Sequence, residues 1–524
     1  MLKAVILMLL PAVCGYADGY LRQPAIDVVH YELSLELTDT SDSIAGTARL
    51  LIRIRDAGVP GMWLDFADME VDRVRVRGVD TRFTYGNGRL SFDLIPPCSR
   101  DEIVVVEVQY HGKPLGGMLF GKNSYGRRVI FTNNWPDQAH HWFPSVDHPS
   151  DKATAEIAIT APEKYSVVSN GRLVHKESLL DGRRLTRWRE GKDIPAYCIS
   201  IGVAEFSILH QPEMNGVPVD WYAYPQDAET AARKFARTAL ALSYFTDLIG
   251  PYPYEKLAQV QATIGPGAME NASAIFYDES LFRGVPLAEN PVPHEIAHQW
   301  FGNSLSVNDW DQLWLSEGFA TYFEALFYEH LNGPEALKQA MAAYFQAIGR
   351  YDHSAPIVDP GLTDLMKKLN PLNYQKGAWV LHMLRGMLGD AKFFEGMRRY
   401  YALHEGSNVS TEDFQNVMES VSGTKLSAFF RQWLYQGGWP EYRVVWRWDQ
   451  AAGKAEVDVQ QRQSTGLFDM PLSLVFSDGS RRELQRIRVM NPEHTFRIAL
   501  PFKPSSLEVD PDGWVMKSLS LENR

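Results

Sequence analysis

One short segment, His294-Glu295-Ile296-Ala297-His298, constrains the fold of this chain more than any other. On an α-helix, residues four apart lie one above the other on the same face, so His294 and His298 can both reach one metal ion. Glu295 follows the first histidine, where its carboxylate can reach a metal-bound water from the side. The segment therefore predicts a helix that carries two zinc ligands and a general base.

A catalytic zinc ion has three protein ligands and one open position, so a third ligand is required. Glu317 is the candidate, because it follows His298 after the eighteen residues 299–316. An amphipathic helix that happens to carry two histidines is the simplest alternative, but a glutamate at this fixed spacing makes chance much less probable. We therefore expect one Zn²⁺ per chain, bound by His294, His298 and Glu317.

Two further motifs flank this segment: Gly265-Pro266-Gly267-Ala268-Met269-Glu270-Asn271 lies before it, and Tyr374-Gln375-Lys376-Gly377 lies after it. In this order the three motifs resemble those of the aminopeptidase N family of gluzincin zinc metallopeptidases, which are G-x-M-E-N, H-E-x-x-H-x18-E and Y-x-K-G. Weaker similarities extend the resemblance over most of the chain: Trp142 to Pro149, Gln432-Trp433-Leu434 and Gly437 to Pro440.

The resemblance implies a zinc-dependent aminopeptidase, which releases N-terminal residues from peptides by attack of a zinc-activated water. It gives Glu295 the role of general base and Tyr374 the role of oxyanion stabiliser. Glu270 would bind the free α-amine of the peptide, and the cleft around it would hold the substrate as an added strand. The substrate-binding residues implied are Gly267, Ala268, Met269, Glu270 and Asn271. A plain turn with a solvated Glu270 is the alternative.

One segment departs from the family pattern. The family usually carries Gln or Glu side chains that bind the first substrate residue where this chain has Thr132-Asn133-Asn134-Trp135-Pro136. Asn133 can make a shorter contact and Trp135 can line the first pocket, so the resemblance does not define the preferred first residue. Separately, Glu324 lies two helical turns after Glu317 and is either a hydrogen-bond partner of a zinc histidine or a solvated glutamate.

Hydrophobic patterning predicts a multidomain α+β fold. Residues 18–207 alternate with period two and predict an N-terminal β-sheet domain of saddle shape. Residues 208–439 predict a thermolysin-like, mostly helical catalytic domain, whose first helix spans 227–248. Residues 440–524 predict a small C-terminal β-sandwich. Many members of the resembled family continue into a large helical domain, so we expect a compact three-domain form without it.

Residues 1–17 read as a secretory signal peptide, with Lys3 before the apolar run 4–10 and a cleavage site after Ala17. We expect an exported protein, periplasmic or secreted, with no stable membrane insertion after signal removal. An uncleaved N-terminal anchor and a lipid attached at Cys14 are the alternatives. Cys98 and Cys198 can pair, but two buried free thiols are the simpler expectation.

The net charge of −12 provides no basic excess to meet phosphates, which argues against a nucleic-acid partner. Three other functions compete with the aminopeptidase. A non-catalytic peptide-binding protein on this fold should have lost a ligand or Glu295, and an endopeptidase should lack Glu270. An enzyme similar to leukotriene hydrolases would add a second hydrolytic activity on the same zinc. Since every one of these residues is present, peptides with a free N-terminus are the expected partners.

Overall fold

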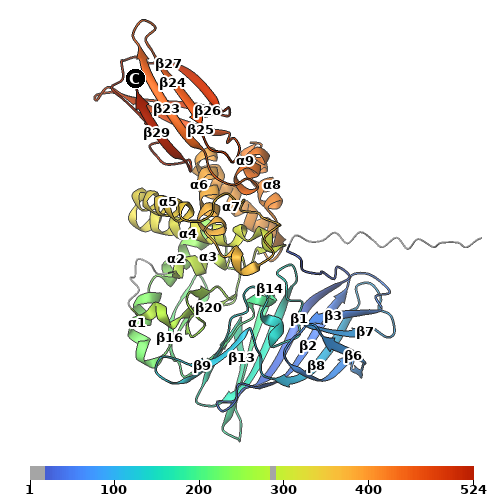
Figure 1. The fold of residues 1–524 in the computed structure, drawn as a ribbon. Coiled ribbons are helices and arrows are strands. Elements are labelled where there is room, and N and C mark those ends of the chain that lie inside the picture. Colours follow the sequence, from blue (N-terminus) through green and yellow to red (C-terminus); the bar gives the residue numbers. More distant parts are fainter. Residues whose placement is uncertain (1–17, 284–290) are drawn as a thin grey trace, which may run out of the picture.

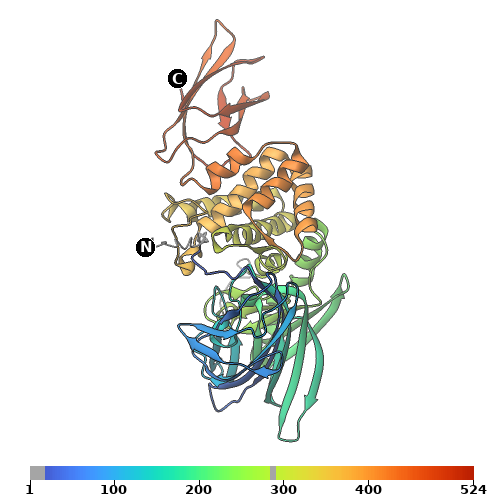
Figure 2. The same ribbon diagram turned by 90° about the vertical axis from the view of Figure 1, so that its right-hand side faces the viewer.

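The computed structural model describes residues 18–283 and 291–524, so the predicted signal peptide at 1–17 lies outside the described residues. Its parts are arranged end to end, with a helical part between two β-rich parts (Figures 1 and 2). The predicted multidomain α+β fold is therefore confirmed. The cysteines at 98 and 198 are both buried and free. Within the described residues, no helix combines the length and hydropathy that crossing a membrane requires.

The N-terminal part is built on an eight-stranded sheet in the order β13-β14-β11-β1-β2-β8-β4-β5. Its strands bury every second side chain, as in β1, where Leu33 and Leu35 are buried between more exposed residues. The strands of this sheet are β1 (Ile26–Glu36), β2 (Ile44–Ile54), β4 (Glu70–Val76), β5 (Val79–Asp80), β8 (Ile103–Gly112), β11 (Lys152–Pro162), β13 (Arg172–Ser178) and β14 (Arg183–Pro195).

Two smaller sheets complete this part, in the orders β12-β15-β10-β9 and β3-β7-β6. Their strands are β3 (Gly61–Asp65), β6 (Phe83–Gly86), β7 (Arg89–Asp93), β9 (Met118–Lys122), β10 (Arg128–Thr132), β12 (Ser166–Ser169) and β15 (Ile201–Ala204).

The central part begins with a five-stranded sheet in the order β16-β17-β18-β20-β19. Its strands are β16 (Ser207–Met214), β17 (Val217–Ala223), β18 (Leu257–Ala262), β19 (Ala268–Met269) and β20 (Ala274–Asp278). Every residue of β18 is buried, as expected for a strand with parallel neighbours on both sides. The sheet leads directly into the glycine-rich segment, because β19 is its edge strand.

Helices form the rest of the central part, and α4 lies against α3, α5 and α6 (Figure 1). They are α1 (Ala228–Phe235), α2 (Thr238–Leu248), α3 (Val292–His298), α4 (Trp314–Asn332), α5 (Pro334–Gly349), α6 (Gly377–Leu388), α7 (Asp390–His404), α8 (Thr411–Ser422) and α9 (Ser427–Leu434). A two-stranded ladder of β21 (Ser306–Val307) and β22 (Asn408–Val409) joins two of the loops.

The single helix predicted over 227–248 is wrong, since the structure divides it into α1 and α2. The two halves pack against different neighbours. Phe235 of α1 contacts the rings of Tyr277 and Phe282, whereas Phe245 of α2 contacts Trp300. The break falls at residues 236–237, which form a turn.

The C-terminal part has two sheets, in the orders β27-β24-β23-β29 and β26-β25-β28. They face each other in part through Trp446 and Phe476, whose ring centroids are 6.2 Å apart. The strands are β23 (Glu441–Asp449), β24 (Lys454–Gln461), β25 (Met470–Ser477), β26 (Arg482–Val489), β27 (Glu493–Ala499), β28 (Ser506–Val509) and β29 (Ser518–Asn523).

Candidate active site

The two histidines of the short helix α3 point to the same place as a glutamate in the first turn of α4. The Nε2 atoms of His294 and His298 are 3.0 Å apart. Glu317 Oε2 lies 3.5 Å from the Nε2 atom of His294 and 3.3 Å from that of His298. Three potential ligand atoms therefore form a small triangle between two helices.

This triangle fits a zinc ion. Tetrahedral zinc with bonds of about 2.0–2.1 Å places its ligand atoms ~3.3 Å apart, close to the three distances found. Glu317 Oε2 is also buried without a hydrogen-bond partner, which an ion would provide. In the described ranges, this is the one group of at least three His, Cys, Asp or Glu side chains with ligand atoms within 4.8 Å of one another.

The outer nitrogens of both imidazoles are held by protein groups. His298 Nδ1 lies 3.0 Å from the carbonyl oxygen of Phe301 and 3.1 Å from Ser316 Oγ. Donation from Nδ1 to this carbonyl leaves Nε2 unprotonated and able to bind a metal. His294 Nδ1 lies 3.7 Å from Glu324 Oε2. Glu324 therefore faces His294 at ion-pair distance, beyond the length of a hydrogen bond.

The surroundings of two buried glutamates, Glu317 and Glu295, shift their pKa values in opposite directions. Burial favours the neutral acid at Glu317, but the positive charges of His298 and His294 outweigh it and lower its pKa to about 2. Burial raises the pKa of Glu295 to about 7, against the charges of the same histidines. A divalent cation beside Glu295 would favour its ionised form, which is the form that accepts a proton.

Tyr374 lies beside the cluster on a π-helical turn, Leu372–Lys376. Its ring is parallel to that of His294, with the centroids 6.2 Å apart. Burial, followed by the negative charge of Glu317, raises the pKa of Tyr374 well above its ordinary value. The hydroxyl therefore keeps its proton and can act as a hydrogen-bond donor.

A glycine pair explains how this turn approaches α4. A Cβ atom at Gly318 would lie 2.9 Å from the Cα atom of Gly377, and one at Gly377 would lie 2.9 Å from the Cα atom of Gly318. Any side chain at either position would push the turn away. The glycines that follow Glu317 and Lys376 thus bring Tyr374 close to the metal ligands.

The glycine-rich segment runs along the other side of the cluster. Ala268 and Met269 pair with Tyr277 and Phe276 of β20, and the amide of Asp278 donates to the carbonyl oxygen of Gly267. Asn271 is buried, and its carbonyl oxygen accepts from the amide of Ala274. From Ala268 onward the segment is therefore an edge strand followed by a hydrogen-bonded turn, whereas residues 265–267 are exposed.

Glu270 ends this edge strand, with only 6% of its surface exposed. Its carbonyl oxygen accepts hydrogen bonds from Gln299 Nε2 at 2.8 Å and Asn303 Nδ2 at 2.7 Å. Burial raises the pKa of Glu270; His298 opposes this shift, and Glu317 adds to it. The charges of His298 and Glu317 act on its carboxyl group, which therefore lies near the candidate metal ligands, and a cationic group beside it would favour its ionised form.

The motifs did not reveal the residues that hold Glu270 in place. Gln299 and Asn303 were missed, although they follow His298 closely and are four residues apart. Lys152 was missed as well: it comes from β11 and donates to the carbonyl oxygens of Asn303 and Ser304, at 3.1 and 2.7 Å. Nothing in the local pattern around Lys152 indicates this contact, because its partners are about 150 residues away.

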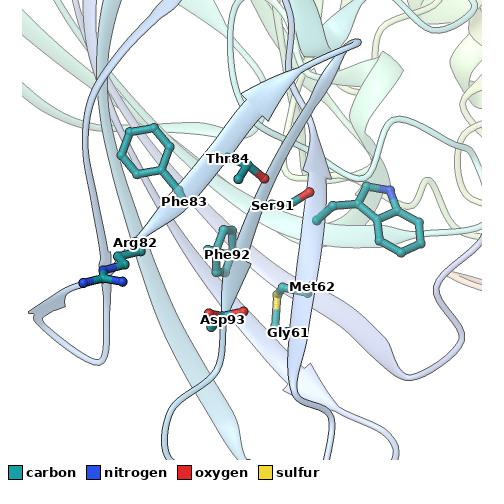
Figure 3. Close-up of a pocket in the computed structure, with 9 residues that line it drawn as sticks. Gly61, Met62, Arg82, Phe83, Thr84, Ser91, Phe92 and Asp93 are labelled. Atoms are coloured by element: carbon teal, nitrogen blue, oxygen red, sulfur yellow. The ribbon is translucent and has the colours of Figure 1, made fainter.

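A separate cavity of about 330 Å³ lies on the sheet of β3, β6 and β7, within the N-terminal part (Figure 3). Figure 3 shows Arg82 and Asp93 at its edge and the rings of Phe83 and Phe92 beside it. Its lining contains no histidine, cysteine or glutamate. This cavity therefore lacks the groups needed for the chemistry of the histidine cluster.

A cluster of two histidines and a glutamate, with a further glutamate after the first histidine, defines the candidate site as that of a metallohydrolase. The comparison with known families agrees. The model of the peptidase family M1 domain matches residues 234–433, and that of the peptidase M1 N-terminal domain matches residues 28–198. The chain belongs to the peptidase M1 family.

Several curated proteins are similar to this chain. Human glutamyl aminopeptidase is 26% identical over 455 residues, which cover 80% of this chain and 47% of the human protein. Aminopeptidase N of Streptomyces lividans is 26% identical over 445 residues, which cover 80% and 51% of the two chains. Aminopeptidase A of Gloydius brevicauda is 26% identical over 461 residues, with shares of 80% and 47%. The chain spans about half the length of these relatives.

Proposed function

We propose that this protein is a zinc-dependent aminopeptidase that removes N-terminal residues from peptides. One arrangement supports the proposal: His294, His298 and Glu317 could hold a metal ion, and the buried carboxyl groups of Glu295 and of Glu270, directly after β19, interact electrostatically with them. Membership of the peptidase M1 family and the names of the relatives support the same activity.

His294, His298 and Glu317 would hold the zinc ion. When bound, zinc supplies a Lewis acid that polarises the scissile carbonyl and lowers the pKa of water. Glu295 takes the proton from the attacking water and then delivers it to the leaving amine. Tyr374 donates a hydrogen bond to the oxygen on which negative charge develops.

The substrate enters as an extended strand beside Ala268 and Met269, with Gly267 and Asn271 at the two ends of this short edge. Glu270 receives the free α-amine, since a buried carboxylate gains a charge-assisted contact from an ammonium group. Because this contact fixes the first residue next to the base, cleavage follows that residue. An endopeptidase would have no use for a buried carboxyl group in this place.

Residues 1–17 support a second part of the proposal, which is export to the periplasm or the medium. Expression of the full chain in bacteria, followed by fractionation and mass spectrometry of the N-terminus, tests it. A mature protein that begins at Asp18 outside the cytoplasm is expected, and an intact N-terminus in the cytoplasm would contradict it.

The activity is tested with a panel of aminoacyl-arylamides and their N-acetylated counterparts, with and without a chelator. We expect hydrolysis of the free-amine substrates alone, loss with the chelator and recovery with Zn²⁺. Equal cleavage of the acetylated substrates would indicate an endopeptidase. Hydrolysis of an epoxide substrate by the same preparation would instead favour the bifunctional enzyme, and binding of peptides without any turnover would favour the non-catalytic protein.

A further inference from the structure

A cavity of about 750 Å³ lies between the N-terminal part and the helical part. Three aromatic side chains line it: Tyr20, Trp135 and Trp310. The rings of Trp135 and Trp310 meet edge to face, with centroids 5.5 Å apart. Its volume lies in the range of pockets that bind small molecules.

The walls of this cavity continue into the elements that carry the candidate catalytic residues. Trp310 begins the short 3-10 helix Trp310–Gln312, which leads into α4 and Glu317. Leu365 and Met366 belong to the turn Leu365–Lys368, a few residues before the π-helical turn with Tyr374.

Besides the segments with Trp310 and with Met366, a third segment lines the cavity. It contains Trp135 and follows β10. The side chain of Asn133 on this segment donates to the carbonyl oxygen of Ile264 at 3.4 Å, directly before the glycine-rich segment. The cavity is therefore lined by segments that precede Glu317 and Tyr374 in the chain and by a segment that contacts the residue before the glycine-rich segment.

One contact joins two walls of the cavity, and a second leads from the cavity toward the metal-ligand cluster. A buried ion pair between Asp311 and Lys368 joins the turn with Trp310 to the turn with Met366. The ring of Tyr197 lies 5.5 Å from that of Trp310, and its hydroxyl donates to the carbonyl oxygen of Gly302 at 3.3 Å. A Cβ atom at Gly302 would be 3.2 Å from His298 Nδ1, so this chain of contacts ends at a zinc ligand.

The charges around the cavity have one sign. The lining includes four aspartates, at 18, 137, 147 and 364, and one histidine, but no lysine or arginine. Asp18 is neutralised locally, since it lies 2.5 Å from His148 Nε2 and 3.6 Å from Arg22. Asp364 has only a solvent-exposed pair with Lys367, at 3.4 Å, which water screens.

The other two aspartates have acceptor capacity left. Asp137 accepts one hydrogen bond, from the neighbouring Gln138. Asp147 is 3% exposed and binds His140 through Oδ2, while its Oδ1 atom is buried without a hydrogen-bond partner. A buried acceptor without a partner in a cavity wall indicates a ligand that donates hydrogen bonds.

We propose that this cavity receives the side chain of the first substrate residue and selects a long side chain with an apolar stem and a cationic head, arginine or lysine. The stem packs against the indole rings of Trp135 and Trp310, and the head lies near the aspartates. The aspartates of the lining disfavour an acidic first residue by charge repulsion. The inference rests on the proposed aminopeptidase function and separates this chain from relatives that are named glutamyl aminopeptidases.

The experiment compares kcat/KM of the zinc-loaded protein for arylamides of arginine, lysine, leucine, alanine and glutamate. Charge-assisted hydrogen bonds predict arginine above glutamate by about 100-fold, and arginine above leucine by about 10-fold. The double variant Asp137→Asn/Asp364→Asn should lose most of the arginine preference and keep its rate on leucine. Both residues are at least partly exposed, so the variant should fold.

Asp352→Asn is the matched control, because Asp352 is exposed and does not line the cavity. It should leave every substrate ratio unchanged. Trp135→Gln should lower the rates on arginine and leucine together, because both lose the ring that packs on the stem.

The outcomes separate this inference from the proposed function. If glutamate is cleaved as fast as arginine, or if the double variant leaves the arginine-to-leucine ratio unchanged, the inference is wrong and the aminopeptidase stands. If no free-amine arylamide is cleaved by the zinc-loaded protein, the proposed function fails, and the inference fails with it.

Discussion

The metal-ligand cluster and the amine-binding end of the cleft are held together in different ways. His294, His298 and Glu317 come from two helices that are close in the chain, and the histidines are fixed by spacing on a single turn. Glu270 is fixed from outside its own segment. Its carbonyl oxygen depends on Gln299 and Asn303, and Lys152 of the N-terminal part holds the loop that contains Asn303.

Because of this difference, the chemical step and the choice of substrate should respond differently to mutation in the proposed enzyme. The ligand cluster needs a few side chains at fixed local spacing, so a change there should abolish chemistry and leave the fold. Binding at the amine-binding end requires the N-terminal and helical parts to keep their positions relative to each other. Changes there should alter the choice of substrate more than the chemical step, and the predictions below test this contrast.

The largest effect is expected for His298→Ala. Loss of one of three ligands should release most of the metal and lower kcat on the order of 10⁴-fold or more, because the activated water is lost. Metal analysis and arylamide hydrolysis measure the two effects. Full retention of both zinc and activity would remove His298 from the site.

Glu295→Gln should retain zinc and lose about 10²- to 10⁴-fold in kcat, because the amide keeps the shape of the side chain but cannot accept the proton. Metal content at the wild-type level is the control. A rate within a few-fold of wild type would mean that another group is the base.

Tyr374→Phe should lower kcat by about 10²- to 10³-fold with little change in KM, since the hydroxyl acts on charge that develops in the transition state. Tyr344→Phe is a matched control, because this hydroxyl is also buried but binds the carbonyl oxygen of Thr321. A change of KM alone for Tyr374→Phe would make Tyr374 a substrate-binding residue.

The sequence predicted the parts of the site that depend on local spacing. The pair on α3 and the carboxylate on α4 follow from residue types at fixed intervals, and the alternation of β1 follows from burial on one face of a sheet. The long-range contacts could not be predicted in this way. Lys152 and Asn303 meet only after two parts of the chain have folded together, and no periodicity carries that information. The turn at residues 236–237 between α1 and α2 was not predicted either, since the helical pattern of apolar residues continues through it.

Glu270→Ala tests the amine-binding end directly. A charge-assisted contact contributes about 1.5–3 kcal/mol, so kcat/KM on free-amine substrates should fall by about 10- to 100-fold. N-acetylation of the substrate should harm the wild type strongly and the variant much less. If acetylation has the same effect on both proteins, Glu270 does not bind the amine.

The smallest effect is expected for Asn303→Ala, which removes one of the two donors to the carbonyl oxygen of Glu270 and leaves Gln299 in place. The strand end should become less well defined, and we expect KM on free-amine substrates to rise by about 3- to 10-fold, the cost of one hydrogen bond. Asn123→Ala is the control: Asn123 is also buried, but its side chain caps a turn in the N-terminal part. It should lower the Tm without changing KM.

The decisive measurement is the double variant Asn303→Ala/Glu270→Ala. If Asn303 acts by positioning Glu270, its effect on KM should nearly vanish once the carboxylate is gone, since the two changes share one mechanism. Additive effects would show that Asn303 acts on the substrate by another route, and the contrast between the locally fixed metal site and the remotely fixed amine site would then be wrong at this position.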